Sequence, residues 1–160
     1  MASEYFLKLE GSNFDGESVK LDKNIDIMSW SWGEANGAAV ATGKGLSAGK
    51  VSAQDMSINF RINRATPYII KACANGEHLK SATVTCRRAG TDPQDYLIMT
   101  LSPVVISSYQ TSGSEGDDLP MDTISLCFGK LEYKYAPQKD DGKLDKQIPI
   151  SYDYATAKAG

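Results

Sequence analysis

The segment Ile25-Asp-Ile-Met-Ser-Trp-Ser-Trp-Gly33 is apolar and leads into the glycine-rich run Glu34-Ala-Asn-Gly-Ala-Ala-Val-Ala-Thr-Gly-Lys-Gly-Leu-Ser-Ala-Gly-Lys50. A strongly alternating segment, Met56-Ser-Ile-Asn-Phe-Arg-Ile62, follows and predicts a half-buried strand. Glycine loses much entropy on ordering, so the run between these two segments is expected to be a long extended loop that folds only against something else. A loop of this length between two strands indicates function.

Further strands are predicted wherever apolar residues alternate on either side of this region. The alternation breaks between Ile27 and Met28, which indicates a bulge or a strand covered on both faces. Pro103 predicts an edge or a bulge between two strands, and the apolar face changes at Gly129. The predicted strands cover residues 5–10, a hairpin partner near Val19 and Leu21, 25–32, 56–62, 82–86, 96–101, 104–109, 124–135 and 148–154, before a frayed tail from 155 to 160.

One short helix is predicted, with Thr66 as its N-cap and Pro67 in its first turn. Its apolar face would carry Ile69, Ile70 and Cys73, and Asn75-Gly76 would end it. Many short strands with one helix predict a mainly β fold: a single domain over residues 1–160, built as a β-barrel of two packed sheets with one short helix and a long extended loop.

Composition excludes several classes of function. The 160 residues carry a net charge of -3 and no basic stripe, which argues against nucleic acid as a partner. No segment has the length and apolarity of a membrane span, and the N-terminus lacks a signal-type apolar region, so synthesis and folding in the cytoplasm are expected. The odd number of cysteines, three, without metal-type spacing favours reduced, buried thiols.

No catalytic, cofactor-binding or metal-binding residues are predicted. His78 is the sole histidine, and a hydrolase that pairs it with Cys86 or Cys127 stays open as an alternative. A buried thiol together with a satisfied or exposed histidine explains the same residues without a special arrangement. The acidic turns near Asp140 and Glu115 lack the spacing of a calcium loop, and the glycine-rich run lacks the phosphate-loop pattern. Trp30 and Trp32 leave open a monomeric ligand-binding β-barrel, although core packing explains them more simply.

Several short motifs in order resemble the haemolysin-coregulated protein (Hcp) family of bacterial type VI secretion systems, over nearly the whole chain. They are Phe6-Leu-Lys-Leu-Glu-Gly11, Ile27-Met-Ser-Trp-Ser-Trp-Gly33, Ala48-Gly-Lys-Val-Ser-Ala-Gln-Asp55, Thr66-Pro67 with Ala72-Cys73 and Gly76-Glu-His78, and Tyr133-Lys-Tyr-Ala-Pro-Gln138. The resemblance implies a structural, non-enzymatic protomer related to phage tail-tube proteins. It further implies hexameric rings that stack into a tube and hold effector proteins in the lumen. The tube would be capped by a VgrG spike, built on a baseplate within a contractile sheath, and secreted on firing without a cleavable signal peptide.

The resemblance also assigns roles to two segments. The glycine-rich run resembles the arm that contacts neighbouring subunits and stacked rings, which implies a contact role for Asn36, Gly37, Val40, Gly43, Lys44, Gly45, Leu46 and Gly49. The turn at Ser112, Gly113, Ser114 and Glu115 resembles a segment that faces the lumen and its cargo.

Overall fold

The computed structural model describes residues 2–41 and 45–160, which form thirteen strands and one helix. The elements are β1 (Ser3–Glu10), β2 (Ile25–Ser31), β3 (Glu34–Asn36), β4 (Ala39–Ala41), β5 (Gly45–Ser47), β6 (Val51–Ala53), β7 (Met56–Arg61), α1 (Thr66–Asn75), β8 (His78–Leu79), β9 (Ser81–Arg88), β10 (Gln94–Ser112), β11 (Met121–Tyr135), β12 (Ile148–Asp153) and β13 (Lys158–Ala159).

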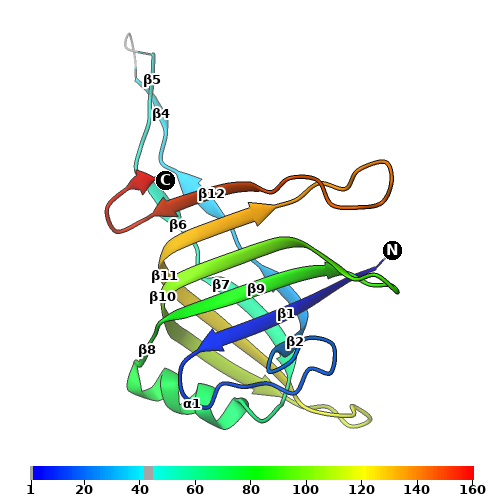
Figure 1. Cartoon of the computed structure of the whole chain (residues 1–160). Helices are drawn as coiled ribbons and strands as arrows, with labels where there is room; N and C mark the ends of the chain where they lie inside the picture. Colours follow the sequence, from blue (N-terminus) through cyan, green and yellow to red (C-terminus); the bar gives the residue numbers. More distant parts are fainter. Residues whose placement is uncertain (1, 42–44) are drawn as a thin grey trace.

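Six strands close into a barrel in the order β11, β7, β2, β1, β9 and β10, with β10 pairing back onto β11 (Figure 1). The predicted mainly β barrel with one short helix is therefore confirmed. The sheet is continuous around the barrel rather than divided into two, and the arm pairs form two further small sheets. Closure leaves no free edge within the barrel, because each of the six strands has a partner on both sides.

The two longest strands change neighbours along their length. β11 pairs with β7 over Met121–Leu126 and with β12 over Lys130–Tyr135. The change in apolar phase expected at Gly129 lies at this switch. β10 runs without interruption through a cis Ser102–Pro103 peptide bond, pairing first with β9 and then with β8. One part of β10 and one part of β11 therefore pair with barrel strands β9 and β7, and the other parts pair with the additional strands β8 and β12.

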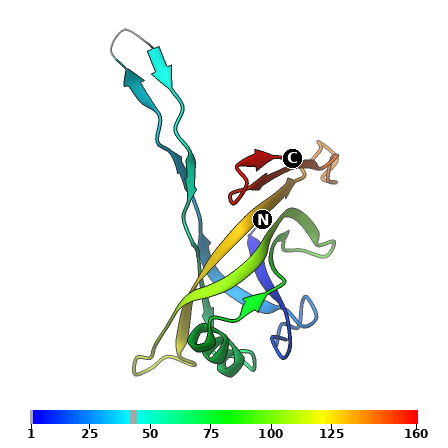
Figure 2. The same cartoon turned by 90° about the vertical axis from the view of Figure 1, so that its left-hand side faces the viewer.

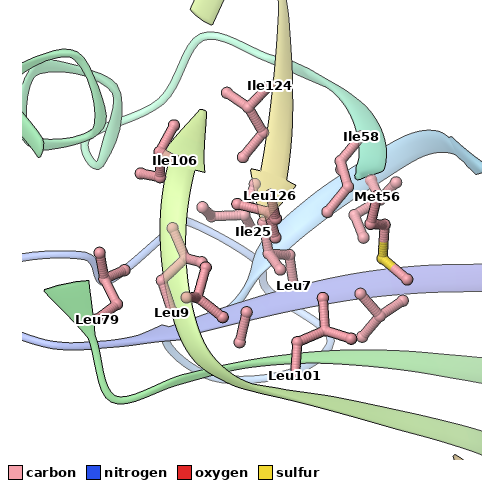
Figure 3. Packing of buried hydrophobic residues seen from close by; sticks show 14 of the residues in the cluster. Leu7, Leu9, Ile25, Met56, Ile58, Leu79, Leu101, Ile106, Ile124 and Leu126 are labelled. Atoms are coloured by element: carbon pink, nitrogen blue, oxygen red, sulfur yellow. The ribbon is translucent and has the colours of Figure 1, made fainter. Parts of the chain in front are cut away.

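The barrel interior is filled by apolar side chains from every barrel strand, together with residues of β8 and α1, and Figure 3 labels ten members of this core. In β7, Met56, Ile58 and Phe60 are fully buried, as their alternation predicts. Ile62 lies beyond the end of β7 and is partly exposed, which corrects its predicted place on that face. The bulge predicted after Ile27 is present as a register shift between β2 and β7.

Helix α1 ends as predicted, because Gly76 adopts the left-handed conformation (φ 65°) and its N–H reaches the carbonyls of Ala72 and Cys73. Its start differs. Ala65 is the N-cap residue, and Thr66 is buried inside the first turn, where its hydroxyl donates to Asp122 of β11 at 2.8 Å. Ile70 is exposed, whereas Ile69 is buried, so the helix packs through a narrower face than predicted.

Three other predictions are wrong. Residues 19 and 21 form no strand, and the place beside β1 predicted for them is taken by β2, whose residues 25–27 pair with residues 5–7. The tail is ordered, since β13 pairs with β12 and Gly160 exchanges backbone hydrogen bonds with Ser151. Of the three free thiols only that of Cys86 is fully buried, and Cys127 is exposed.

Candidate assembly surfaces

The described parts of the glycine-rich run and the residues after it, 34–41 and 45–53, form an arm with paired strands rather than a loop without structure. β3 pairs with β6, and β4 pairs with β5, so the described parts build a long antiparallel hairpin that projects from the barrel (Figure 2). The expected lack of internal structure is therefore wrong. Cross-strand backbone hydrogen bonds do not require large side chains, and a hairpin satisfies them even where the sequence is mostly Gly, Ala and Ser.

The two paired sections of the arm meet at a joint made by Gly37 and Gly49. A Cβ atom on Gly49 would lie 2.5 Å from the carbonyl oxygen of Gly37, which is closer than real contacts allow. The Gly49 N–H donates to Asn36 Oδ1 at 2.8 Å and fixes the crossing. Glycine is required here by close backbone approach, which is the physical reason for its presence in an extended arm.

An aromatic cluster holds the base of the arm against the C-terminal segment. Trp32 packs on Phe128 with ring centroids 6.1 Å apart, and Phe128 meets Tyr154 edge to face at 5.8 Å. The Tyr154 hydroxyl donates to Glu34 Oε2 at 2.7 Å, and burial together with this carboxylate raises the pKa of Tyr154 well above its usual value. The arm therefore starts from a fixed base.

The residues assigned to subunit contacts are spread along this arm. Asn36, Gly37 and Gly49 form the joint, while Gly45 and Leu46 lie in the outer section, where Leu46 is 80% exposed. Val40 pairs with Leu46 through the backbone. Gly43 and Lys44 lie outside the described residues. The structure thus brings the described members together on one projecting element.

The second assigned segment is the turn after β10. Ser112 is the last residue of β10, and Gly113, Ser114 and Glu115 begin an exposed turn in which the Ser114 N–H donates to Asp117 Oδ2 at 3.2 Å. Figure 1 shows this turn at the end of the barrel opposite the arm. The two assigned segments do not meet within one chain.

A polar outer face that the sequence reading missed covers β2, β7 and β11. Thr123 donates to Asn59 Oδ1 at 2.6 Å, and Asn59 donates to Ser29 at 2.7 Å, so a chain of side-chain hydrogen bonds crosses three strands. Ser57 and Ser125 are cross-strand partners on the same face. The polar residues that alternate with the buried apolar residues along each strand indicate this face, because side chains at every second position point to the same side of a sheet.

The alternative sites are not assembled. Trp30 packs edge to face on Tyr5 at 6.1 Å, and Trp32 packs on Phe128. Both tryptophan rings lie partly buried against the core, so neither forms an open platform. His78 and Cys127 both pair with Val105, one from each side. A strand therefore lies between them, and no hydrogen bond joins the two side chains within the described residues.

The pKa values of two thiols also argue against a reactive cysteine. Burial raises the pKa of Cys127, and the neighbouring Asp55 carboxylate raises it further. Burial raises the pKa of Cys86 to about 12. A nucleophilic thiol needs the opposite shift, because the thiolate is the reactive form.

Metal-binding clusters and membrane-spanning helices are both missing from the described ranges. No group of three or more His, Cys, Asp or Glu side chains among residues 2–41 and 45–160 is placed to hold a metal ion. Within the same residues, no helix has both the length and the apolarity that crossing a membrane requires.

The fold defines the class of protein as a closed β-barrel with a projecting arm. The family model described as "Type VI secretion system effector, Hcp" matches residues 6–135. The chain belongs to the Hcp family of type VI secretion system proteins, which is a structural family of secreted tube components rather than a family of enzymes. The resemblance seen in the sequence is confirmed.

Individual proteins agree with this assignment. The chain is 36% identical over 155 residues to "Protein hcp1" of Pseudomonas aeruginosa, covering 96% of this chain and 95% of the relative. A structure described as that of a type six secretion system protein has a TM-score of 0.93 at 27% identity, covering 99% and 100% of the two chains. Hcp1 from Salmonella typhimurium has a TM-score of 0.81 at 30% identity, with both chains fully covered.

Proposed function

We propose that this protein is the ring-forming subunit of the type VI secretion inner tube. Six copies close into a ring, rings stack on a baseplate inside a contractile sheath, and a VgrG spike caps the tube. The tube assembles in the bacterial cytoplasm and leaves the cell when the sheath contracts. The subunit supplies a rigid hollow conduit, and the mechanical work comes from the sheath.

The arm is the observation that carries this proposal. Its outer section, as far as the structure describes it, projects away from the barrel, and it exposes Leu46 to solvent (Figure 2). An exposed two-stranded hairpin is only marginally stable in water, so covering it with another copy would stabilise it. Asn36, Gly37, Val40, Gly43, Lys44, Gly45, Leu46 and Gly49 are accordingly proposed as the residues of this contact.

We assign the lumen to polar surfaces. The hydroxyl and amide groups of Ser29, Asn59 and Thr123 are already joined to one another, so a passing protein would not find a large apolar patch to which it adheres. Ser112, Gly113, Ser114 and Glu115 form a polar turn suited to weak contacts with cargo. Effector proteins are proposed to bind these surfaces noncovalently and to be protected during export.

The native mass tests the proposal. Light scattering coupled to size exclusion should give a mass near six protomers, roughly 100 kDa as ring closure requires. Electron microscopy of concentrated samples should show rings and stacked rings. A monomer at every concentration tested would contradict the ring. Titration of small ligands, followed by the fluorescence of Trp30 and Trp32, would then test the ligand-binding barrel.

A further inference from the structure

Outside the arm and helix α1, the exposed large apolar side chains of the described residues fall into two groups with different composition. The first, called here the Ile150 face, consists of Tyr135, Ile148 and Ile150. The second, called here the Met28 surface, consists of Val19, Met28, Ile62 and Leu119. Single exposed apolar residues are ordinary, but two groups of them on one small domain indicate surfaces that become covered.

The Ile150 face arises because β11 and β12 continue past the barrel. Ile148 pairs with Tyr135 and Ile150 pairs with Tyr133, so these side chains share one face of the extension. Ile148 and Ile150 are each 58% exposed. Ile150 also lines a groove of about 720 Å³ whose other wall is the base of the arm, including Lys50 and Val51.

The Met28 surface surrounds the bulge in β2. Met28 is the extra residue of that bulge and is 51% exposed, and it lines two adjoining hollows. One hollow also contains Val19, which is 95% exposed, and the other contains Ile62 and Leu119. An exposed apolar surface is therefore available around Met28, away from the residues that line the groove beside Ile150.

The two surfaces each carry charges of both signs, and one carboxylate and one ammonium group among them could pair. In addition to Asp26 and Lys50, the hollows are lined by Glu4, Glu17, Lys20 and Arg61, and the groove by Glu34. Asp26 lines both hollows around Met28. Lys50 lines the groove beside Ile150. In the part of the chain that the structure describes, neither side chain has an ion-pair partner, so each can serve a second copy.

We propose that the Ile150 face of one copy packs on the Met28 surface of another copy, with Lys50 of the first near Asp26 of the second. This proposal deepens the ring-forming function and rests on it. Because the two surfaces differ, the contact joins copies head to tail, and it can repeat until a ring or a stack is complete. A symmetric dimer, by contrast, would use one surface twice.

Cysteine cross-linking tests the proposal. The parent is the full chain with Cys73→Ser and Cys127→Ser, since buried Cys86 is protected. Ile150→Cys and Met28→Cys are introduced singly, the two proteins are mixed during assembly, and a short bismaleimide is added. In an equal mixture, about half of the copies with Ile150→Cys meet a copy with Met28→Cys at their Ile150 face in a head-to-tail assembly. We therefore expect up to about half of the protein to become covalent dimer, and the double variant to give a ladder of longer products.

Matched controls define the other outcomes. Ile70→Cys places a thiol on α1 with a similar exposed fraction of 44%, and it should give at least tenfold less dimer with Met28→Cys. Cross-linking of Ile150→Cys to itself would replace the proposal with a symmetric contact. If the parent forms rings but the Ile150→Cys and Met28→Cys proteins do not cross-link, the proposed contact is wrong and the ring-forming function stands. If the parent stays monomeric, the ring-forming function itself is wrong.

Discussion

Tyr154 donates its hydroxyl hydrogen to Glu34 Oε2 at 2.7 Å, which joins the C-terminal segment to the first strand of the arm across 120 residues of sequence. The aromatic contacts of Trp32, Phe128 and Tyr154 lie beneath this hydrogen bond. The direction in which the arm leaves the barrel therefore depends on the end of the chain as well as on the arm itself.

Replacing Tyr154 by Phe should loosen the base of the arm without unfolding the barrel. One hydrogen bond to a carboxylate is worth about 1 kcal/mol here, so the opened population of the arm should rise roughly fivefold. Limited proteolysis within residues 34–53 measures this rise. Tyr152→Phe is the matched control, because Tyr152 packs on Tyr154 at 4.9 Å but its hydroxyl has no hydrogen-bond partner within the described residues. Equal cleavage rates for the two variants would argue against the proposed role.

The joint of the arm gives a second prediction. Gly49→Ala should impair assembly, because the new Cβ would lie 2.5 Å from the Gly37 carbonyl oxygen and force the two sections of the arm apart. Gly37→Ala should be tolerated, since its Cβ would meet nothing within 4 Å. Both variants should keep the stability of the barrel within about 0.5 kcal/mol. Negative-stain microscopy of both proteins at one concentration compares their assemblies.

Deleting residues 38–46 should leave a folded barrel that no longer stacks. The deletion removes β4 and most of β5 and lies outside all six barrel strands. Circular dichroism and the urea midpoint should stay close to those of the full chain, while tube formation is lost. Tubes formed by the shortened protein would remove the arm from the stacking contact.

Thr66 and Asp122 supply a prediction about stability. The carboxylate of Asp122 is fully buried and accepts hydrogen bonds from Thr66 at 2.8 Å and from Tyr109 at 3.0 Å. Thr66→Val should lower the free energy of unfolding by about 1–3 kcal/mol, because it leaves a buried acceptor with one partner fewer. Thr123→Val removes a hydroxyl on the outer face and should cost less. Urea unfolding of both variants gives the comparison.

Cys86 predicts a loss of stability in alkaline solution. Burial raises its pKa from 9.0 to about 12, so the folded state holds the thiol proton more tightly than the unfolded state does. Its contribution is complete below pH 9 and declines as the pH rises from 9 towards 12, by up to about 1.4 kcal/mol per unit. Urea unfolding at pH 8, 9 and 10 under reducing conditions should show a shallower decline for Cys86→Ala than for the parent.

Much of the barrel could be read from alternation, because burial of one sheet face imposes a period of two on the residues of β1, β7 and β11. The hairpin partner near Val19 could not be excluded in this way, since two apolar residues beside turn signals fit a short strand equally well. Thr66 was placed at the N-cap because its buried partner, Asp122, is distant in sequence. The polar halves of the alternating patterns contain Ser29, Asn59 and Thr123, but their hydrogen bonds depend on which distant strands pair.

The sequence by itself determined the class of fold, the helix end at Gly76, the break in alternation after Ile27 and membership of the Hcp family. These features depend on local backbone preferences and on the order of short motifs along the chain. Only the tertiary structure decided that the glycine-rich run is a paired arm, that β11 exchanges β7 for β12, and that Ile150 and Met28 lie exposed on separate surfaces. Such features depend on which distant strands meet, and the free energy of those pairings is set by contacts that no local pattern encodes.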